Sequence, residues 1–154
     1  MGKIYSTDVK YFNKDEFPED PEEFADPVLI FSLDRLRGLI GNKIYPSPVK
    51  GALARFDERS KKSQHYAVDR KSTAIDIFPE GDPYINLLLI LQSKLFNGVG
   101  VYFDTYYFGR FRTMFHLDLR ENPLLWTRTG HTYRYQSEPF FWYELKEQLC
   151  QTLL

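Results

Sequence analysis

The chain has 154 residues, of which 43% are hydrophobic and 27% are charged, so it fits one globular domain with a substantial core. Its formal net charge of −1 gives no electrostatic reason to expect nucleic acid or a membrane as a partner. Cys150 is the single cysteine, which excludes an intrachain disulfide and a metal site built from thiolates.

The N-terminal segment carries no signal for export or membrane insertion. Met1 to Ser6 lacks an apolar run, and the longest such run, 87–91, is too short to cross a bilayer. We therefore expect a product that is synthesised in the cytoplasm without a signal peptide. Residues 1–25 are aromatic and acidic with prolines nearby, which predicts an irregular N-terminal arm.

Two Asp-Pro steps predict the start of helices, because the aspartate accepts from the first free amides and the proline needs no donor there. After Asp26-Pro27, apolar residues recur at three- and four-residue steps until Gly41, where the helix is expected to end. The second step, Asp82-Pro83, predicts a buried helix that ends at Asn97-Gly98. Residues 138–154 are predicted to form a closing helix.

Short strands are predicted between these helices. They cover residues 43–45, 74–78, 99–103 and 114–119, and residues 104–112 are expected to be an aromatic and basic connection. The predicted architecture is a single α+β domain over residues 1–154. It has a small, mainly antiparallel sheet with helices on one face.

Two histidines and two carboxylates lie where a metal could be held. His65 follows a polar loop, Asp76 lies between two isoleucines in a strand pattern, and His116 lies in the last predicted strand. Catalytic zinc usually takes three such ligands and leaves a fourth position for water, so these three residues predict a mononuclear Zn²⁺ site. Asp118 shares a strand face with His116 and is predicted to act as the general base beside that water.

The histidines could also have ordinary structural roles without a metal. His65 could be a solvated loop residue, and His116 could be a hydrogen-bonded histidine of the core. His131 could be a competing ligand, but no carboxylate stands at a matched position near it.

The order of the motifs resembles the D-alanyl-D-alanine metallopeptidase family, the zinc peptidases of the hedgehog/DD-peptidase fold. The resemblance rests on Ser63-Gln64-His65, Ala74-Ile75-Asp76-Ile77, Gly98-Val99-Gly100-Val101-Tyr102 and His116-Leu117-Asp118-Leu119-Arg120, and covers roughly residues 11–128. Ten residues separate the first histidine from the aspartate, which is similar to phage-borne relatives.

The resemblance implies an activity and roles for further residues. It implies a zinc metallopeptidase that hydrolyses peptide bonds in peptidoglycan stems and is encoded by a bacteriophage, as an endolysin would be. Arg55, upstream of the first histidine, would hold the substrate carboxylate or assist the oxyanion. Ser63 and Gln64 can orient the loop of that histidine through side-chain hydrogen bonds. The implied substrate-binding residues are Ser63, Gln64, Tyr102 and Trp126, and the family's groove would also be lined by Tyr106, Tyr107 and Phe108.

Two other classes of function stay open. A virion protein of the tail or capsid could keep the peptidase fold and serve mainly in assembly with other phage proteins. A sugar-binding module would instead need a stripe of exposed aromatic rings away from the histidines. A peptidase would act on the cell wall, and a virion protein would be carried in the particle. Neither interpretation has nucleic acid or a membrane as partner.

Overall fold

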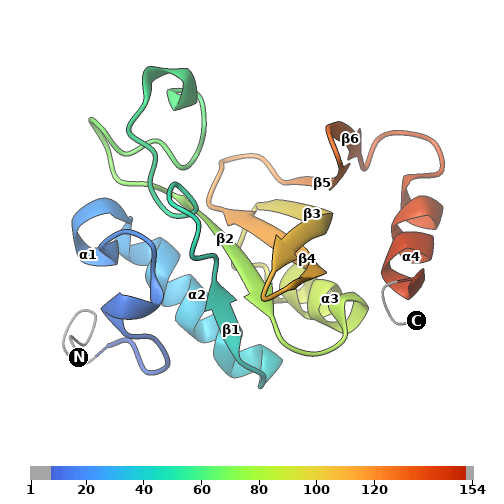
Figure 1. Cartoon of the computed structure of the whole chain (residues 1–154), viewed down its shortest axis with the longest axis horizontal. Helices are drawn as coiled ribbons and strands as arrows, with labels where there is room; N and C mark the ends of the chain where they lie inside the picture. Colours follow the sequence, from blue (N-terminus) through green and yellow to red (C-terminus); the bar gives the residue numbers. More distant parts are fainter. Residues whose placement is uncertain (1–7, 152–154) are drawn as a thin grey trace.

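A six-stranded sheet lies at the centre of the structure, a computed structural model that describes residues 8–151 (Figure 1). The strand order is β1-β2-β4-β3-β5-β6, and neighbouring strands are antiparallel except for the parallel pair of β3 and β5. The strands are β1 (Ile44–Pro46), β2 (Ala74–Pro79), β3 (Gly98–Tyr107), β4 (Arg110–Asp118), β5 (Leu124–Thr129) and β6 (Thr132–Tyr135).

Four α-helices accompany the sheet within residues 8–151, so the predicted α+β class with a mainly antiparallel sheet is confirmed. The helices are α1 (Pro21–Phe24), α2 (Pro27–Ile40), α3 (Pro83–Ser93) and α4 (Phe141–Gln151), and two short 3-10 helices cover Lys14–Glu16 and Glu58–Ser60. Each helix in this part of the chain is too short or too polar to cross a lipid bilayer.

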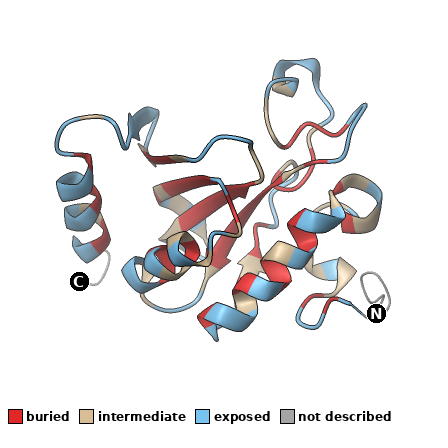
Figure 2. Cartoon of the chain, turned by 180° about the vertical axis from the view of Figure 1, so that it is seen from behind, coloured by how far each residue is buried: buried red, intermediate tan, exposed pale blue. Residues whose placement is uncertain are grey.

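One face of the sheet forms the core with α2 and α3. Figure 2 shows the molecule from behind, with these two helices in front of the sheet. Side chains alternate between the two faces of a strand, so Ile75, Ile77 and Leu117 point into this core with Leu29 and Leu33 of α2. Their neighbours in the sequence point to the opposite face. That second face carries Asp76 and His116, two of the three predicted metal ligands.

The Asp-Pro steps begin helices as predicted. Asp26 accepts from the amide of Val28 at the start of α2, and Asp82 accepts from the first amides of α3. A third step at Asp20-Pro21 begins the short helix α1 in the same way. The predicted end of α2 at Gly41 is also confirmed, because Gly41 has a left-handed conformation with φ of 75°.

The N-terminal arm is packed more closely than its composition indicated. Val9, Phe12 and Phe17 are buried in the core, and the carboxylate of Asp34 in α2 accepts from the amides of Lys10 and Tyr11. Residues 8–25 are therefore part of the folded body. The first part of the predicted arm, residues 1–7, lies outside the described residues.

Residues 104–112 differ most from the predicted elements. They were expected to connect two strands, but β3 and β4 continue into a hairpin that turns at Phe108 and Gly109, both with positive φ. The helix after Asp82 ends earlier than predicted, at Ser93, because Lys94 takes a left-handed conformation. The closing helix is α4, and residues 152–154 of its predicted range lie outside the described part of the chain.

Candidate metal centre

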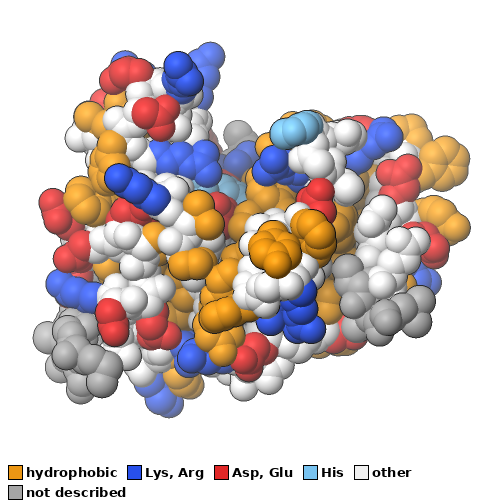
Figure 3. Space-filling view, viewed as in Figure 1, with side chains coloured by type: hydrophobic (Ala, Val, Ile, Leu, Met, Phe, Trp, Pro, Cys, Tyr) orange, Lys and Arg blue, Asp and Glu red, His pale blue; other side chains and the backbone are white. Residues whose placement is uncertain are grey.

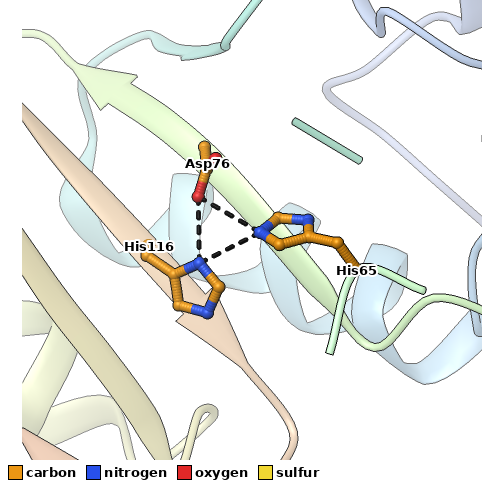
Figure 4. A group of neighbouring side chains, drawn as sticks. All are labelled: His65, Asp76 and His116. Atoms are coloured by element: carbon orange, nitrogen blue, oxygen red, sulfur yellow. Dashed lines mark hydrogen bonds and ion pairs between the residues drawn. The ribbon is translucent and has the colours of Figure 1, made fainter. Parts of the chain in front are cut away.

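Three side-chain atoms from distant parts of the sequence converge on one point (Figure 4). Nε2 of His65 lies 3.1 Å from Nδ1 of His116, and Oδ1 of Asp76 lies 3.4 Å from the first atom and 3.0 Å from the second. All three residues are buried, with at most 7% of each exposed. The structure therefore brings together the three ligands that the sequence predicted.

The sheet positions two of these ligands. Asp76 of β2 and His116 of β4 are directly paired across the antiparallel ladder, so their side chains stand next to each other on the same face. Ile75 and Ile77 point to the opposite face and into the core. This arrangement explains why a carboxylate lies between two isoleucines in the sequence.

A loop positions the third ligand. The amide of Arg55 donates to the carbonyl of His65, and Oγ of Ser63 accepts from the amide of His65. Thr73 donates to the side chain of Gln64, so Ser63 and Gln64 both make side-chain hydrogen bonds, as the sequence predicted. Nδ1 of the His65 ring lies 3.4 Å from the carbonyl of Leu53, which leaves Nε2 to face Asp76.

The spacing of the three atoms fits a small tetrahedral ion. Zinc binds nitrogen and oxygen at about 2.0–2.2 Å, so two donors on a tetrahedral zinc lie about 3.4 Å apart. The observed separations of 3.0, 3.1 and 3.4 Å are close to this value. Two imidazoles and one carboxylate are also a donor set that suits zinc and several other divalent metals. The residues can therefore hold a metal ion.

The charges of these groups also favour a cation. Burial by itself would raise the pKa of Asp76, but hydrogen bonds from His116 and His65 hold that pKa well below its usual range, so the residue is an anion. Burial lowers the pKa of His65, which keeps its imidazole neutral and able to bind metal. Burial also acts to lower the pKa of His116, but its hydrogen bonds to Asp118 and Asp76 raise that pKa.

Asp118 contacts His116 on the edge of the ring that faces away from the other two ligands. Its Oδ2 lies 2.9 Å from Nε2 of His116, whereas Nδ1 of the same ring faces Asp76. Arg120 donates to both oxygens of this fully buried carboxylate, at 2.8 Å from Nε to Oδ1 and 2.6 Å from its terminal nitrogen to Oδ2. These contacts favour an orienting role for Asp118, and its predicted role as general base beside the water remains a prediction.

The sequence and the structure of the chain were compared with known protein families, curated proteins and solved structures. No family model, curated protein or solved structure matches the chain. The interpretation of the site therefore rests on its own geometry and on the order of its motifs.

Two glycines explain the Gly-x-Gly motif of β3. Gly98 is paired with Asp118 and Gly100 with His116, and a Cβ on Gly98 would overlap the Asp118 carboxylate. A Cβ on Gly100 would lie only 2.6 Å from the indole of Trp126. The glycines therefore leave room for neighbouring side chains to lie over the central strand.

Trp126 lies beside the His116 ring on the metal-ligand face of the sheet. It is buried on β5, and its ring centroid lies 5.3 Å from that of His116. Tyr102 lies on the same face of the sheet, and burial raises its pKa to about 12. Substrate binding by these two residues, and by Ser63 and Gln64, remains a prediction.

The other candidate residues, Arg55 and His131, are not part of the three-residue group. Arg55 is linked to His65 through the backbone, while its guanidinium Nε donates to the carbonyl of Gly51 and lines a surface pocket with Lys50 and Asp57. His131 is exposed and lies outside the three-residue group, so it does not compete for the metal.

Sequence reasoning assigned no role to Arg120, although it ends the His-x-Asp-x-Arg motif. Its spacing of two residues from Asp118 is the sequence signal that could have identified it. Residues two apart on an extended segment lie on one face, so Arg120 can reach Asp118 just as Asp118 reaches His116. This chain of contacts fixes which ring nitrogen of His116 faces the other ligands.

Proposed function

We propose that the chain is a zinc-dependent peptidase of the hedgehog/DD-peptidase fold that hydrolyses peptide bonds in peptidoglycan stems. The observation that carries this proposal is the convergence of His65, Asp76 and His116 on one point. The order of the motifs along the chain supports the same family. A bacteriophage origin belongs to this proposal, since the loop between His65 and Asp76 resembles the phage-borne members.

Each residue of the centre has a defined task in this proposal. His65, Asp76 and His116 would hold the ion, and Asp118 with Arg120 would fix the tautomer and orientation of the His116 ring. When bound, Zn²⁺ would polarise the scissile carbonyl and lower the pKa of the attacking water. The Trp126 ring lies beside the His116 ring and would shield one side of it from solvent.

The surface above the centre offers access for a polymer substrate. Figure 3 shows a hollow between two raised parts of this face, with histidine atoms inside it and Lys or Arg side chains beside it. We propose that the substrate peptide binds in this hollow. Basic walls suit a peptide that carries carboxylates.

Metal analysis followed by digestion of purified peptidoglycan tests the proposal. We expect about one zinc per chain and release of peptide fragments that mass spectrometry assigns to cleavage within the stem. His116→Ala should lose both the metal and the fragments, while His131→Ala, a matched change of an exposed histidine, should keep both. Zinc binding by the wild-type protein without release of any stem fragment would overturn the peptidase assignment.

A second candidate, an assembly subunit of a phage virion, is favoured by one observation. Phe140, Trp142 and Tyr143 at the start of α4 are 78%, 57% and 65% exposed. Large exposed rings commonly mark a surface for another protein. An assembly role predicts that Trp142→Ser reduces incorporation into particles while zinc content and peptidoglycan hydrolysis stay unchanged.

A further inference from the structure

Arg128 of β5 lies between two tyrosine rings on the face of the sheet that carries the metal ligands. Its guanidinium carbon is 5.3 Å from the ring centroid of Tyr102 and 5.8 Å from that of Tyr133. Both distances are within the range of a cation–π contact. The two rings therefore hold the guanidinium in place from both sides.

The register of the strands explains this arrangement. Tyr102 of β3 pairs with Arg128 of β5, and Arg128 pairs with Tyr133 of β6, so the three side chains form one row across the sheet. The neighbouring row runs from His116 through Gly100 and Trp126 to Tyr135. The tyrosine–arginine row is thus the row of side chains next to the metal centre.

The guanidinium of Arg128 is fixed but not neutralised. Its Nε donates to the carbonyl of Gly130 at 2.8 Å, and no ion pair of Arg128 occurs among residues 8–151. Arg120 and Arg134, its neighbours in the fold, are each paired with a carboxylate. The terminal nitrogens of Arg128 remain available, and a planar guanidinium binds a carboxylate with two parallel hydrogen bonds.

The open edge of β6 is a poor site for an added strand. In an antiparallel pair every second residue of an edge strand points its backbone groups outward, and here these residues are Tyr133 and Tyr135. Both outward groups of Tyr135 are used, since its amide donates to the Glu138 carboxylate and its carbonyl accepts from the Glu138 amide. A ligand on this side therefore has the side chains of the row to contact, rather than the backbone of Tyr135.

We propose that Tyr102, Arg128 and Tyr133 form a binding site for a carboxylate of the peptide substrate, with Arg128 as the carboxylate-binding group. This inference rests on the proposed peptidase function and specifies its substrate. It identifies an acidic residue of the peptide as a specificity determinant. The two rings pack against the chain of the peptide on either side of that residue.

The position of Arg128 in the sheet determines how far the acidic residue of the peptide substrate lies from the scissile bond. Arg128 is two strands across and two residues along from His116, which places their Cα atoms about 12 Å apart for strands about 4.8 Å apart with a rise of about 3.3 Å per residue. Its side chain is directed toward Gly130, away from the row of His116. An extended peptide covers about 3.3–3.6 Å per residue, so the carboxylate belongs to a residue about three positions from the scissile bond.

Equilibrium binding of two peptides to metal-free protein tests this site without turnover. One probe is a synthetic peptidoglycan stem pentapeptide, and the other is the same peptide with its internal carboxylates converted to carboxamides. We expect calorimetry to show that the wild-type protein binds the acidic peptide about ten- to a hundredfold more tightly, as for a hydrogen-bonded charge pair. Arg128→Gln should remove this preference, and Arg128→Lys should keep only part of it because the planar fork is lost.

Arg134→Gln is the matched control, because Arg134 lies on the same hairpin but lines a pocket with α4 instead of the row of Arg128. It should leave the preference unchanged. Equal binding of the two peptides by the wild-type protein, or a preference that survives in Arg128→Gln, would overturn the proposal. If Arg128 provides the preference but zinc-loaded protein cleaves no stem peptide, this binding site stands and the peptidase assignment fails.

Discussion

The two sides of the metal centre are built differently. Asp76 and His116 stand on paired strands inside the sheet, and His116 is also held by the buried carboxylate of Asp118 and by Arg120 behind it. His65 stands on a loop that a few hydrogen bonds fix, among them those of Arg55 and Ser63. Changes on the sheet side should therefore disturb the centre more than changes on the loop side.

Removing a ligand from the sheet side should have the largest effect. His116→Ala leaves two ligands, which are too few to compete with water and buffer, so the bound metal should be lost after dialysis. Metal content by mass spectrometry is the measurement, with His131→Ala as the control. A variant that still holds about one metal per chain would show that His116 is not a ligand.

Asp118→Asn tests the support behind that ligand. The amide has the same size but loses the charge that holds the His116 ring and Arg120, so metal affinity should fall about 10- to 100-fold. A general base would behave otherwise, since its loss lowers turnover about 10²–10⁴-fold and leaves metal affinity unchanged. Titration with a zinc chelator, together with turnover at saturating zinc, separates the two roles. Unchanged affinity with lost turnover would restore the general-base prediction.

Acidic pH should weaken the centre through the sheet-side histidine. The pKa of His116 is raised by its bonds to Asp118 and Asp76, so below that pKa a proton occupies Nδ1 and the metal must displace it. Metal affinity should therefore fall about tenfold for each pH unit below the raised pKa and level off above it. Calorimetry in two buffers of different ionisation enthalpy should detect release of about one proton per metal. Affinity that is constant from neutral to acidic pH would contradict this account.

A change on the loop side should have the smallest effect. Ser63→Ala removes one hydrogen bond to the amide of His65, and such a bond is worth about a two- to tenfold change in an equilibrium constant. Metal affinity by chelator titration should fall within that range. A loss as large as that of His116→Ala would show that the loop and the sheet contribute equally to the centre.

Local signals in the sequence predicted the parts of the fold that depend on neighbouring residues. Asp26-Pro27 and Gly41 mark the ends of α2 because capping needs only the adjacent backbone. The strand with His116 was predicted from alternation, and so was the presence of Asp76 on a polar face. The hairpin tip around Phe108 was missed, since Tyr106, Tyr107 and Phe108 form a run of aromatic residues in which polar and apolar residues do not alternate.

Other features depend on contacts that no local pattern contains. Alternation places Asp118 on the face of His116, but which ring nitrogen it meets depends on where Asp76 and His65 lie in the fold. The row of Tyr102 and Arg128 depends on the parallel pairing of β3 with β5, which joins segments separated by all of β4. The three ligands and the loop contacts of Ser63 and Gln64 could thus be predicted, while the contact of Asp118 with Nε2 of His116 could not.

The glycines of β3 constrain how this protein could be engineered. Because the Asp118 carboxylate and the Trp126 indole fill the space that a side chain would need, any replacement at Gly98 or Gly100 must push one of them out of place. Screens for altered specificity would therefore gain nothing from randomising these two positions. The ring of Tyr106 on the same strand is 64% exposed, so substitutions there should leave the centre intact.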